Sequence, residues 1–211
     1  MSAGFPDRAL REYLLRLGDN DVVLAQRLGE WVGHGPVIEE DIGLTNVGLD
    51  LLGQGRLWLA YAGEVEGRVT GTPRTEDELA FLRDAAAYRN VQLVERPNGD
   101  FAQTIARQFY FDRAHLLLLH GLTGSTDARV ASIAAKALKE VAYHAERSAD
   151  WVVRLGDGTD ESHARMQRAM EDALVVTEEA ARSYGERFGT YHPLVERSGA
   201  DPADVVLVTT G

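Results

Sequence analysis

The stretch Lys139-Glu140-Val141-Ala142-Tyr143-His144 decides how this chain is interpreted, because it offers a carboxylate and an imidazole within one helical pattern. Bundles that hold two irons take Glu-x-x-His from each of two helices and one carboxylate from each of the other two. Here the Glu stands four residues before the His, and Val141 occupies the position three before it. The stretch is therefore an active site, a remnant of one, or ordinary core.

The sequence around this stretch predicts a long helix over residues 128–155. Apolar residues recur at spacings of three and four, as on the buried face of an amphipathic helix. The in-register positions are Ile133, Ala137, Val141, His144, Ser148, Trp151 and Leu155. Gly-rich turns at 124–127 and 156–160 bound the pattern, so His144 is expected to point into a core.

The same periodicity predicts helices along most of the chain. Thr75 with Glu78 and Asp100 with Gln103 form capping-box patterns that mark two helix starts. The expected helices cover residues 7–17, then, after a break at Gly18-Asp19-Asn20, a segment to about 33, and further segments 37–66, 75–89, 101–122 and 160–184. The fold class is all-α: one domain over residues 1–211, with a bundle of long antiparallel helices, shorter additional helices and a poorly specified tail from about residue 185.

Two glycines of the segment 37–66 are expected to mark close helix packing. Gly48 and Gly55 lie two turns apart on one face, although glycine in a helix interior costs about 1 kcal/mol relative to alanine. We interpret them as positions where a neighbouring helix approaches the backbone. A kinked helix is the alternative.

Composition excludes several classes of function. The chain has 211 residues, no Cys and a formal net charge of −11. Without Cys there are no disulfides, thiolate nucleophiles or Cys-ligated metals, and the acidic balance disfavours nucleic acid as a partner. No apolar run approaches the length of a membrane helix, and residues 1–7 lack the features of a signal peptide. We expect a cytoplasmic protein that binds neither nucleic acid nor membrane.

Three polar residues fall within apolar stripes of different helices: Gln54, Asp112 and His144. Burying such groups without a partner costs roughly 1–3 kcal/mol, so each needs a role. One interpretation is a shared metal or proton-transfer site, to which Glu140 and Asp50 could contribute. The other is a hydrogen-bonded polar cluster, for instance His144 with Asp112. The acidic residues near helix ends are expected to be solvated: Glu30, Glu39, Glu40 and Asp41.

No other catalytic motif competes with this cluster. The chain contains no Gly-x-Ser-x-Gly nucleophile elbow, no phosphate-binding Gly-x-x-x-x-Gly-Lys loop and no Gly-x-Gly-x-x-Gly fingerprint. Gly53-Gln54-Gly55 is too short to count as one.

Several strings together resemble the phenylacetic acid catabolic family of ferritin-like proteins, specifically its C-type subunit in the phenylacetyl-CoA epoxidase complex. The resemblance covers residues 14–170 and departs after about Tyr184, where chains of that type usually continue with helical sequence. The matching strings are 17–20, 30–34, 46–55, 95–101, 104–108, 136–144 and 154–160. It implies a ferritin-like bundle belonging to an oxygenase that epoxidises the ring of phenylacetyl-CoA.

The resemblance also implies which positions correspond to iron ligands of the catalytic subunit. The first-helix carboxylate falls at Leu24, and the next Glu-x-x-His falls at Leu51 and Gln54. The third-helix carboxylate falls at Asp112, and the last Glu-x-x-His at Val141 and His144. Only Asp112 and His144 keep a ligand-type side chain, and Leu24, Leu51 and Val141 would fill the cavity of two irons.

The sequence therefore predicts a non-catalytic structural subunit of a multicomponent phenylacetyl-CoA monooxygenase. No metal or other cofactor is expected in this chain, and iron is expected in the partner, the di-iron catalytic subunit. A homodimer is a further option. One alternative is a stand-alone di-iron oxygenase that uses Asp112, His144, Glu140 and Asp50. Another is a helical scaffold unrelated to aromatic catabolism.

Overall fold

The computed structural model describes residues 4–188, 196–197 and 205–206, and within these the side chains of residues 6–178. The long helices are α1 (Gly4–Gly29), α2 (Ile38–Thr70), α5 (Phe101–Leu122), α6 (Ala128–Gly156) and α7 (Asp160–Phe188). Shorter elements are α3 (Glu76–Phe81), the 3₁₀ turn η1 (Ala85–Ala87), α4 (Gln92–Glu95) and the two-residue strands β1 (Glu196–Arg197) and β2 (Val205–Val206). The predicted all-α, ferritin-like bundle is confirmed.

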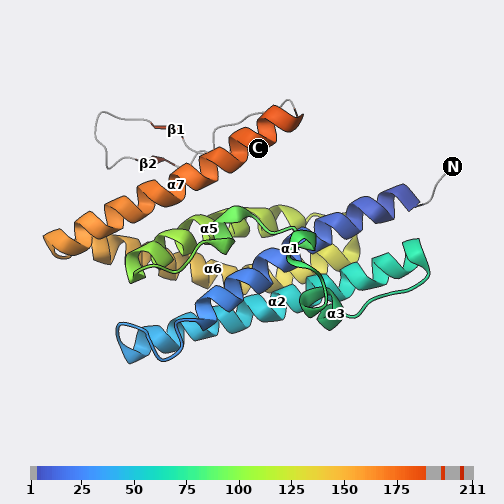
Figure 1. The fold of residues 1–211 in the computed structure, drawn as a ribbon, viewed down its shortest axis with the longest axis horizontal. Helices are drawn as coiled ribbons and strands as arrows, with labels where there is room; N and C mark the ends of the chain where they lie inside the picture. Colours follow the sequence, from blue (N-terminus) through green and yellow to red (C-terminus); the bar gives the residue numbers. More distant parts are fainter. Residues whose placement is uncertain (1–3, 189–195, 198–204, 207–211) are drawn as a thin grey trace.

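The long helices are arranged as two packed pairs with one covering helix. Helix α1 packs mainly on α2, and α5 mainly on α6, while α7 lies against α5 and α6 (Figure 1). Direct packing between α2 and α6 is sparse. The antiparallel strands β1 and β2 pair Glu196 with Val206 and Arg197 with Val205. The predicted apolar run 205–208 lies outside the described residues except at 205–206.

The buried apolar residues form two clusters at opposite ends of the bundle. The first joins the N-terminal half of α1, the C-terminal half of α2 and the facing ends of α5 and α6, with Leu14, Trp58 and Val141 among its members. The second joins the other halves of α1, α2 and α5 with α7, and includes Leu24 and Leu51. On α1, α2, α5 and α6 the two clusters meet near the middle of the helix, and several of the buried polar residues lie there.

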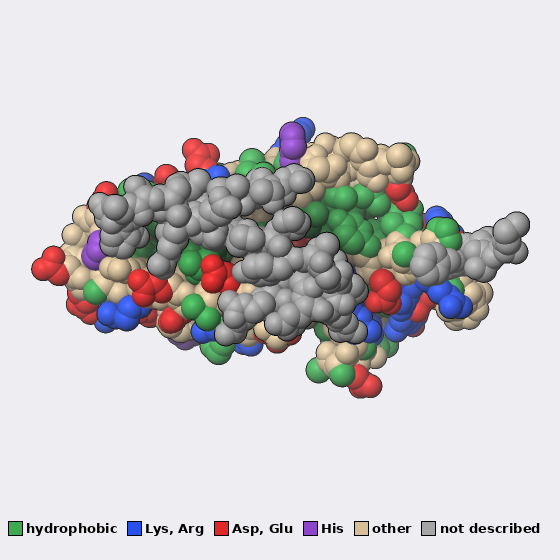
Figure 2. Space-filling view, turned by 90° about the horizontal axis from the view of Figure 1, so that it is seen from above, with side chains coloured by type: hydrophobic (Ala, Val, Ile, Leu, Met, Phe, Trp, Pro, Cys, Tyr) green, Lys and Arg blue, Asp and Glu red, His purple; other side chains and the backbone are tan. Residues whose placement is uncertain are grey.

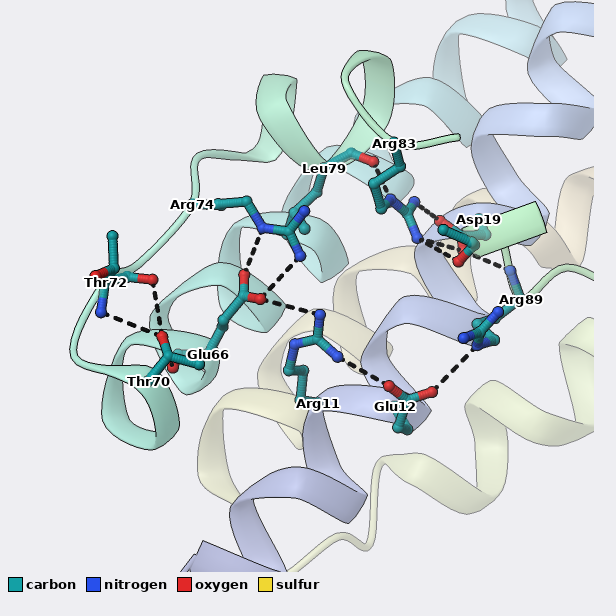
Figure 3. Close-up of polar contacts among 11 residues, drawn as sticks. Arg11, Glu12, Asp19, Glu66, Thr70, Thr72, Arg74, Leu79, Arg83 and Arg89 are labelled. Atoms are coloured by element: carbon teal, nitrogen blue, oxygen red, sulfur yellow. Dashed lines mark hydrogen bonds and ion pairs between the residues drawn. The ribbon is translucent and has the colours of Figure 1, made fainter. Parts of the chain in front are cut away.

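The expected break at Gly18-Asp19-Asn20 is wrong, because α1 continues through it. Gly18 lets α2 approach: a Cβ there would lie 2.7 Å from two atoms of Leu59. The Asp19 carboxylate is buried and does not cap a helix. It accepts hydrogen bonds from the Arg83 guanidinium and, at 2.8 Å, from the backbone N–H of Arg89 (Figure 3). The residue that suggested a turn in the sequence therefore forms an ion pair between distant segments of the chain.

The predicted helix over 75–89 starts correctly and ends too late. The Thr75 capping box is present, but α3 stops at Phe81. Beyond it the chain leaves the helix so that Arg83 reaches Asp19, while the Tyr88 hydroxyl donates to the Ala80 carbonyl. Nearby, Glu66 accepts from Arg74 at 2.8 Å and from Arg11 at 3.0 Å, which ties this connection to α1 and α2 (Figure 3).

Helix α2 confirms the interpretation of its glycines. A Cβ at Gly55 would lie 2.9 Å from Val22 Cγ2 and 3.2 Å from the Gly18 carbonyl, and one at Gly48 would touch the Ala25 carbonyl at 3.5 Å. The helix is one continuous element and runs four residues further than expected. It ends at Gly71, whose φ of 80° is the left-handed conformation that glycine adopts readily.

Candidate functional site

The candidate site is a layer of buried polar side chains between the two apolar clusters. Four helices contribute to it: Asp21 from α1, Gln54 from α2, Asp112 and His115 from α5, and His144 from α6. None of these residues is more than 5% exposed. The expectation that Gln54, Asp112 and His144 enter the core from different helices is confirmed.

His144 is hydrogen-bonded to α2. Its Nε2 lies 3.0 Å from Oδ2 of Asp50, whose side chain is 41% exposed. Burial lowers the pKa of His144, and the carboxylate of Asp50 opposes this in part. The expected pairing of His144 with Asp112 is therefore wrong, because the imidazole points across to α2. Asp50, named above as a possible contributor to a shared site, lies at the edge of the core.

A second polar contact joins the same two helices. Gln54 Nε2 donates to Glu140 Oε2 at 2.8 Å. A shallow pocket of about 100 Å³ lies on this seam and is lined by Leu49, Gly53 and Lys136 as well as the bonded pair. These hydrogen bonds link α2 and α6, whose direct backbone packing is sparse. Glu140 thus has a structural partner.

Asp112 contacts its own helix. Its Oδ1 accepts from Gln108 Nε2 at 3.4 Å. Burial raises the pKa of the Asp112 carboxyl to about 7, and a hydrogen bond from Ser148 opposes this more weakly. Part of the Asp112 population is therefore protonated near neutral pH, unlike a carboxylate that a cation holds ionised.

Asp21 and His115 were missed by the sequence interpretation. His115 Nε2 lies 3.9 Å from Asp21 Oδ1, and neither Asp21 oxygen has a hydrogen-bond partner among the described residues. Burial raises the pKa of Asp21 well above its usual value and lowers that of His115 to about 4, with His144 adding to the latter. Burial thus disfavours the charged form of both groups. The sequence could have indicated the burial of Asp21, because this residue shares a helical face with Leu17, Leu24 and Leu28. The turn expected at Gly18-Asp19-Asn20 interrupted that helix, so the pattern was not recognised.

Three buried aliphatic residues border the layer. Leu24, Leu51 and Val141 are each completely buried, the leucines in one cluster and the valine in the other. They lie within one turn of Asp21, Gln54 and His144 respectively. Among the described residues, no three His, Asp or Glu side chains converge closely enough to hold a metal ion.

The acidic residues expected to be solvated differ in outcome. Glu39 is exposed, and Glu30 forms a surface ion pair with Arg27 at 2.9 Å. Glu40 contradicts the expectation, because its side chain is only 15% exposed and pairs with Arg147 of α6. It is a third link across the sparse seam between α2 and α6.

The surface carries charges of both signs. Figure 2 shows acidic and basic side chains interspersed on the face that carries α7, without a continuous basic field among the residues coloured there. None of the helices in the described part of the chain is long and apolar enough to cross a bilayer.

The structure defines the chain as a ferritin-like helical protein whose layer of buried polar side chains lies between two apolar clusters. The chain belongs to the phenylacetic acid catabolic protein family, which it matches over residues 5–187. It is also 52% identical over 161 residues to the C-type subunit of the 1,2-phenylacetyl-CoA epoxidase from Escherichia coli (strain K12). That match covers 76% of this chain and 63% of the relative's length.

Proposed function

We propose that this chain is a non-catalytic structural subunit of a phenylacetyl-CoA epoxidase. Its partner would be the di-iron catalytic subunit, which it stabilises and helps to position. The observation that carries the proposal is the complete burial of Leu24, Leu51 and Val141, which stand where the resemblance places iron ligands of the catalytic subunit. The similarity to the C-type subunit of an epoxidase over most of the chain supports the same assignment.

A pair of iron ions does not fit the residues at this level. Leu24, Leu51 and Val141 have no ligating atom and occupy core volume. Asp112 accepts a hydrogen bond from Gln108, and Nε2 of His144 is hydrogen-bonded to Asp50. Iron or zinc sites in proteins use three or more protein ligands, and clustered carboxylates would add a desolvation cost that aliphatic residues avoid. We therefore derive no oxygen chemistry in this chain.

Co-expression with the related catalytic subunit tests the partnership. We expect the two chains to co-purify and to elute together on sizing, with phenylacetyl-CoA turnover present in the complex and absent from this chain alone. Sizing that finds the two chains separate would contradict the proposed partnership.

The stand-alone oxygenase is the competing function, with Asp112, His144, Glu140 and Asp50 as ligands. The hydrogen bond from Gln54 to Glu140, at 2.8 Å, argues against this function, because it occupies a carboxylate that would have to bind the metal. Partner-free turnover of phenylacetyl-CoA with a reductant would establish that function instead. A scaffold unrelated to aromatic catabolism would neither bind the catalytic subunit nor contribute to its activity.

A further inference from the structure

Seven buried polar atoms in and beside the layer have no hydrogen-bond partner among the described residues. They come from α1, α2, α5 and α6, so the shortage belongs to the layer as a whole and not to one side chain. Native proteins leave few buried polar groups without a hydrogen bond, because each such group costs free energy. The seven atoms are both carboxyl oxygens of Asp21, Oε1 of Gln54 and of Gln108, Nε1 of Trp58, and Nδ1 of His115 and of His144.

Most of these atoms accept hydrogen bonds and do not donate them. The amide oxygens of Gln54 and Gln108 are acceptors, and of the two Asp21 oxygens at most one donates, when the carboxyl is protonated. Nε2 of His144 is hydrogen-bonded to a carboxylate, so the neutral ring carries its proton there and Nδ1 is a further acceptor. Trp58 offers a single N–H donor. Acceptors outnumber donors, and the side chains of the layer therefore do not satisfy one another.

Asp21 and His115 are separated by the distance at which a bridging molecule is expected. Nε2 of His115 lies 3.9 Å from Oδ1 of Asp21, which is too long for a direct hydrogen bond. A water molecule beside the pair forms a hydrogen bond to each, which is a common arrangement for polar groups more than 3.5 Å apart. His115 is 5% exposed, so its ring is not wholly enclosed by protein atoms.

Helix α2 brings a further unpartnered group toward Asp21. A Cβ on Gly55 would lie 3.2 Å from Cβ of Asp21, so the α2 backbone runs directly beside this side chain. Trp58 is three residues further along α2 and is therefore a neighbour of Gly55 on the helix surface. Its side chain is completely buried, and its indole N–H has no acceptor among the described residues. Unpartnered groups of α1, α2 and α5 thus lie around one carboxyl.

Water fits this set of atoms better than a metal ion does. A water molecule both donates and accepts, so it satisfies the excess acceptors and the Trp58 N–H alike. A cation would serve the acceptors only, and among the described residues no three His, Asp or Glu side chains converge to hold one. Solvent also comes close to the layer, because Gln54 and Asp50 line the pocket of about 100 Å³ between α2 and α6.

We propose that the polar layer is a binding site for ordered water, with one molecule bridging Asp21 and His115. Buried water molecules make about three hydrogen bonds each, so the seven unpartnered atoms correspond to about two such molecules. The assignment goes beyond the proposed function, since it concerns the interior of this chain alone and holds with or without a catalytic subunit.

A crystal structure of the natural chain, at a resolution that defines ordered water, tests the site directly. We expect a water molecule within hydrogen-bond distance of an Asp21 oxygen and of a second unpartnered atom from another helix. Well-ordered Asp21 and His115 side chains with no water beside them, or bonded directly to each other, would overturn the proposal. Anomalous scattering that identifies a metal ion at this position would overturn it as well.

Nuclear Overhauser effects between water and the protein test the same site in solution. Water bound at Asp21 should give a cross-peak to the indole N–H of Trp58, whose signal is assigned with Trp58→Phe. Asp21→Leu should abolish the cross-peak, because no carboxyl oxygen remains to hold the water. Asp21→Asn is the matched polar variant and should keep it, although it lacks a carboxyl proton that could exchange with water and imitate the effect.

Circular dichroism checks that each of these variants is folded. An unchanged cross-peak in Asp21→Leu would mean that Asp21 does not hold the water. Absence of the cross-peak from the natural chain or from Asp21→Asn would mean that no bound water lies beside Trp58. Either result contradicts the proposal.

Discussion

At the residue scale, the layer between the two clusters shows how polar side chains are accommodated inside a bundle where burial disfavours their charged forms. Burial raises the pKa of Asp21 and lowers that of His115, and His144 is hydrogen-bonded to the half-buried Asp50. Leu24, Leu51 and Val141 complete the level with side chains that need no partner. Buried polar side chains and aliphatic side chains therefore lie next to each other here, and each kind of position leads to a prediction.

Val141→Glu is expected to destabilise the protein. The new carboxyl would be buried without a counter-charge, which should lower the free energy of unfolding by about 3 kcal/mol or more. Ferrous iron should not restore the loss, because Leu24 and Leu51 supply no oxygen ligand. Urea unfolding with and without the metal measures both effects. Ala142→Glu, on the exposed side of the same helix, is the control and should change stability by less than ~0.5 kcal/mol. If iron restored the stability of Val141→Glu, the layer of buried polar side chains would still be able to bind a metal.

Asp112→Asn should alter the pH dependence of stability. The unfolded carboxyl has a pKa near 3.8 and the folded one about 7. A raised folded pKa contributes stability that is present below the unfolded value and lost as pH rises through the folded value. Asp112→Asn should therefore gain stability relative to the natural chain between about pH 4 and pH 7, by up to a few kcal/mol.

Thermal unfolding at a series of pH values measures this difference. Asp150→Asn, at an exposed carboxyl of α6, serves as the control and should show no such trend. If the difference between Asp112→Asn and the natural chain is the same at pH 4 and pH 8, the account of Asp112 fails.

At the element scale, the helices are placed by close backbone approach and by a few buried ion pairs. Periodicity and capping boxes were sufficient to predict α5 and α6 almost to the residue. Periodicity and capping boxes gave wrong helix bounds at Gly18-Asp19-Asn20 and after Phe81. Residue types that favour turns, such as Asp, also form ion pairs between distant elements, and the sequence alone does not distinguish the two roles. Asp19 looks like an N-cap in sequence, and only its partner Arg83, 64 positions away, shows that it belongs inside α1.

Gly55→Ala should weaken the packing of α1 on α2. The added methyl would lie 2.9 Å from Val22 Cγ2 and 3.2 Å from the Gly18 carbonyl, so the helices must move apart. We expect a loss of about 1–3 kcal/mol, as for overpacked cores. Gly53→Ala, where a Cβ meets nothing within 4 Å, should instead gain up to about 1 kcal/mol from helix propensity. Equal effects of the two changes in denaturant unfolding would contradict the close approach.

Arg83→Met should remove the link that fixes the connection after α3 to α1. The Arg83 and Asp19 side chains are 4% and 0% exposed, and breaking a buried pair typically costs about 3–5 kcal/mol. Arg165→Met, which breaks an exposed pair on α7, should cost less than ~1 kcal/mol. Urea unfolding compares the two, and a small effect of Arg83→Met would mean that the connection is held by other contacts.

At the scale of the whole molecule, the fold class could be predicted because long amphipathic helices dominate the chain. The family could be predicted because several short strings matched together, and the match over residues 5–187 confirms it. The polar layer could be predicted only in part. Gln54, Asp112 and His144 stood out within apolar stripes, whereas their partners depend on how helices face each other, which periodicity does not encode.

The central claim is that this chain supports an epoxidase without holding its metal. The most direct measurement is the iron, manganese and zinc content of the chain purified without chelator, alone and after separation from the co-expressed catalytic subunit. The account predicts far less than one metal ion per chain in both preparations, with iron in the catalytic subunit. A stoichiometric metal in this chain would contradict it.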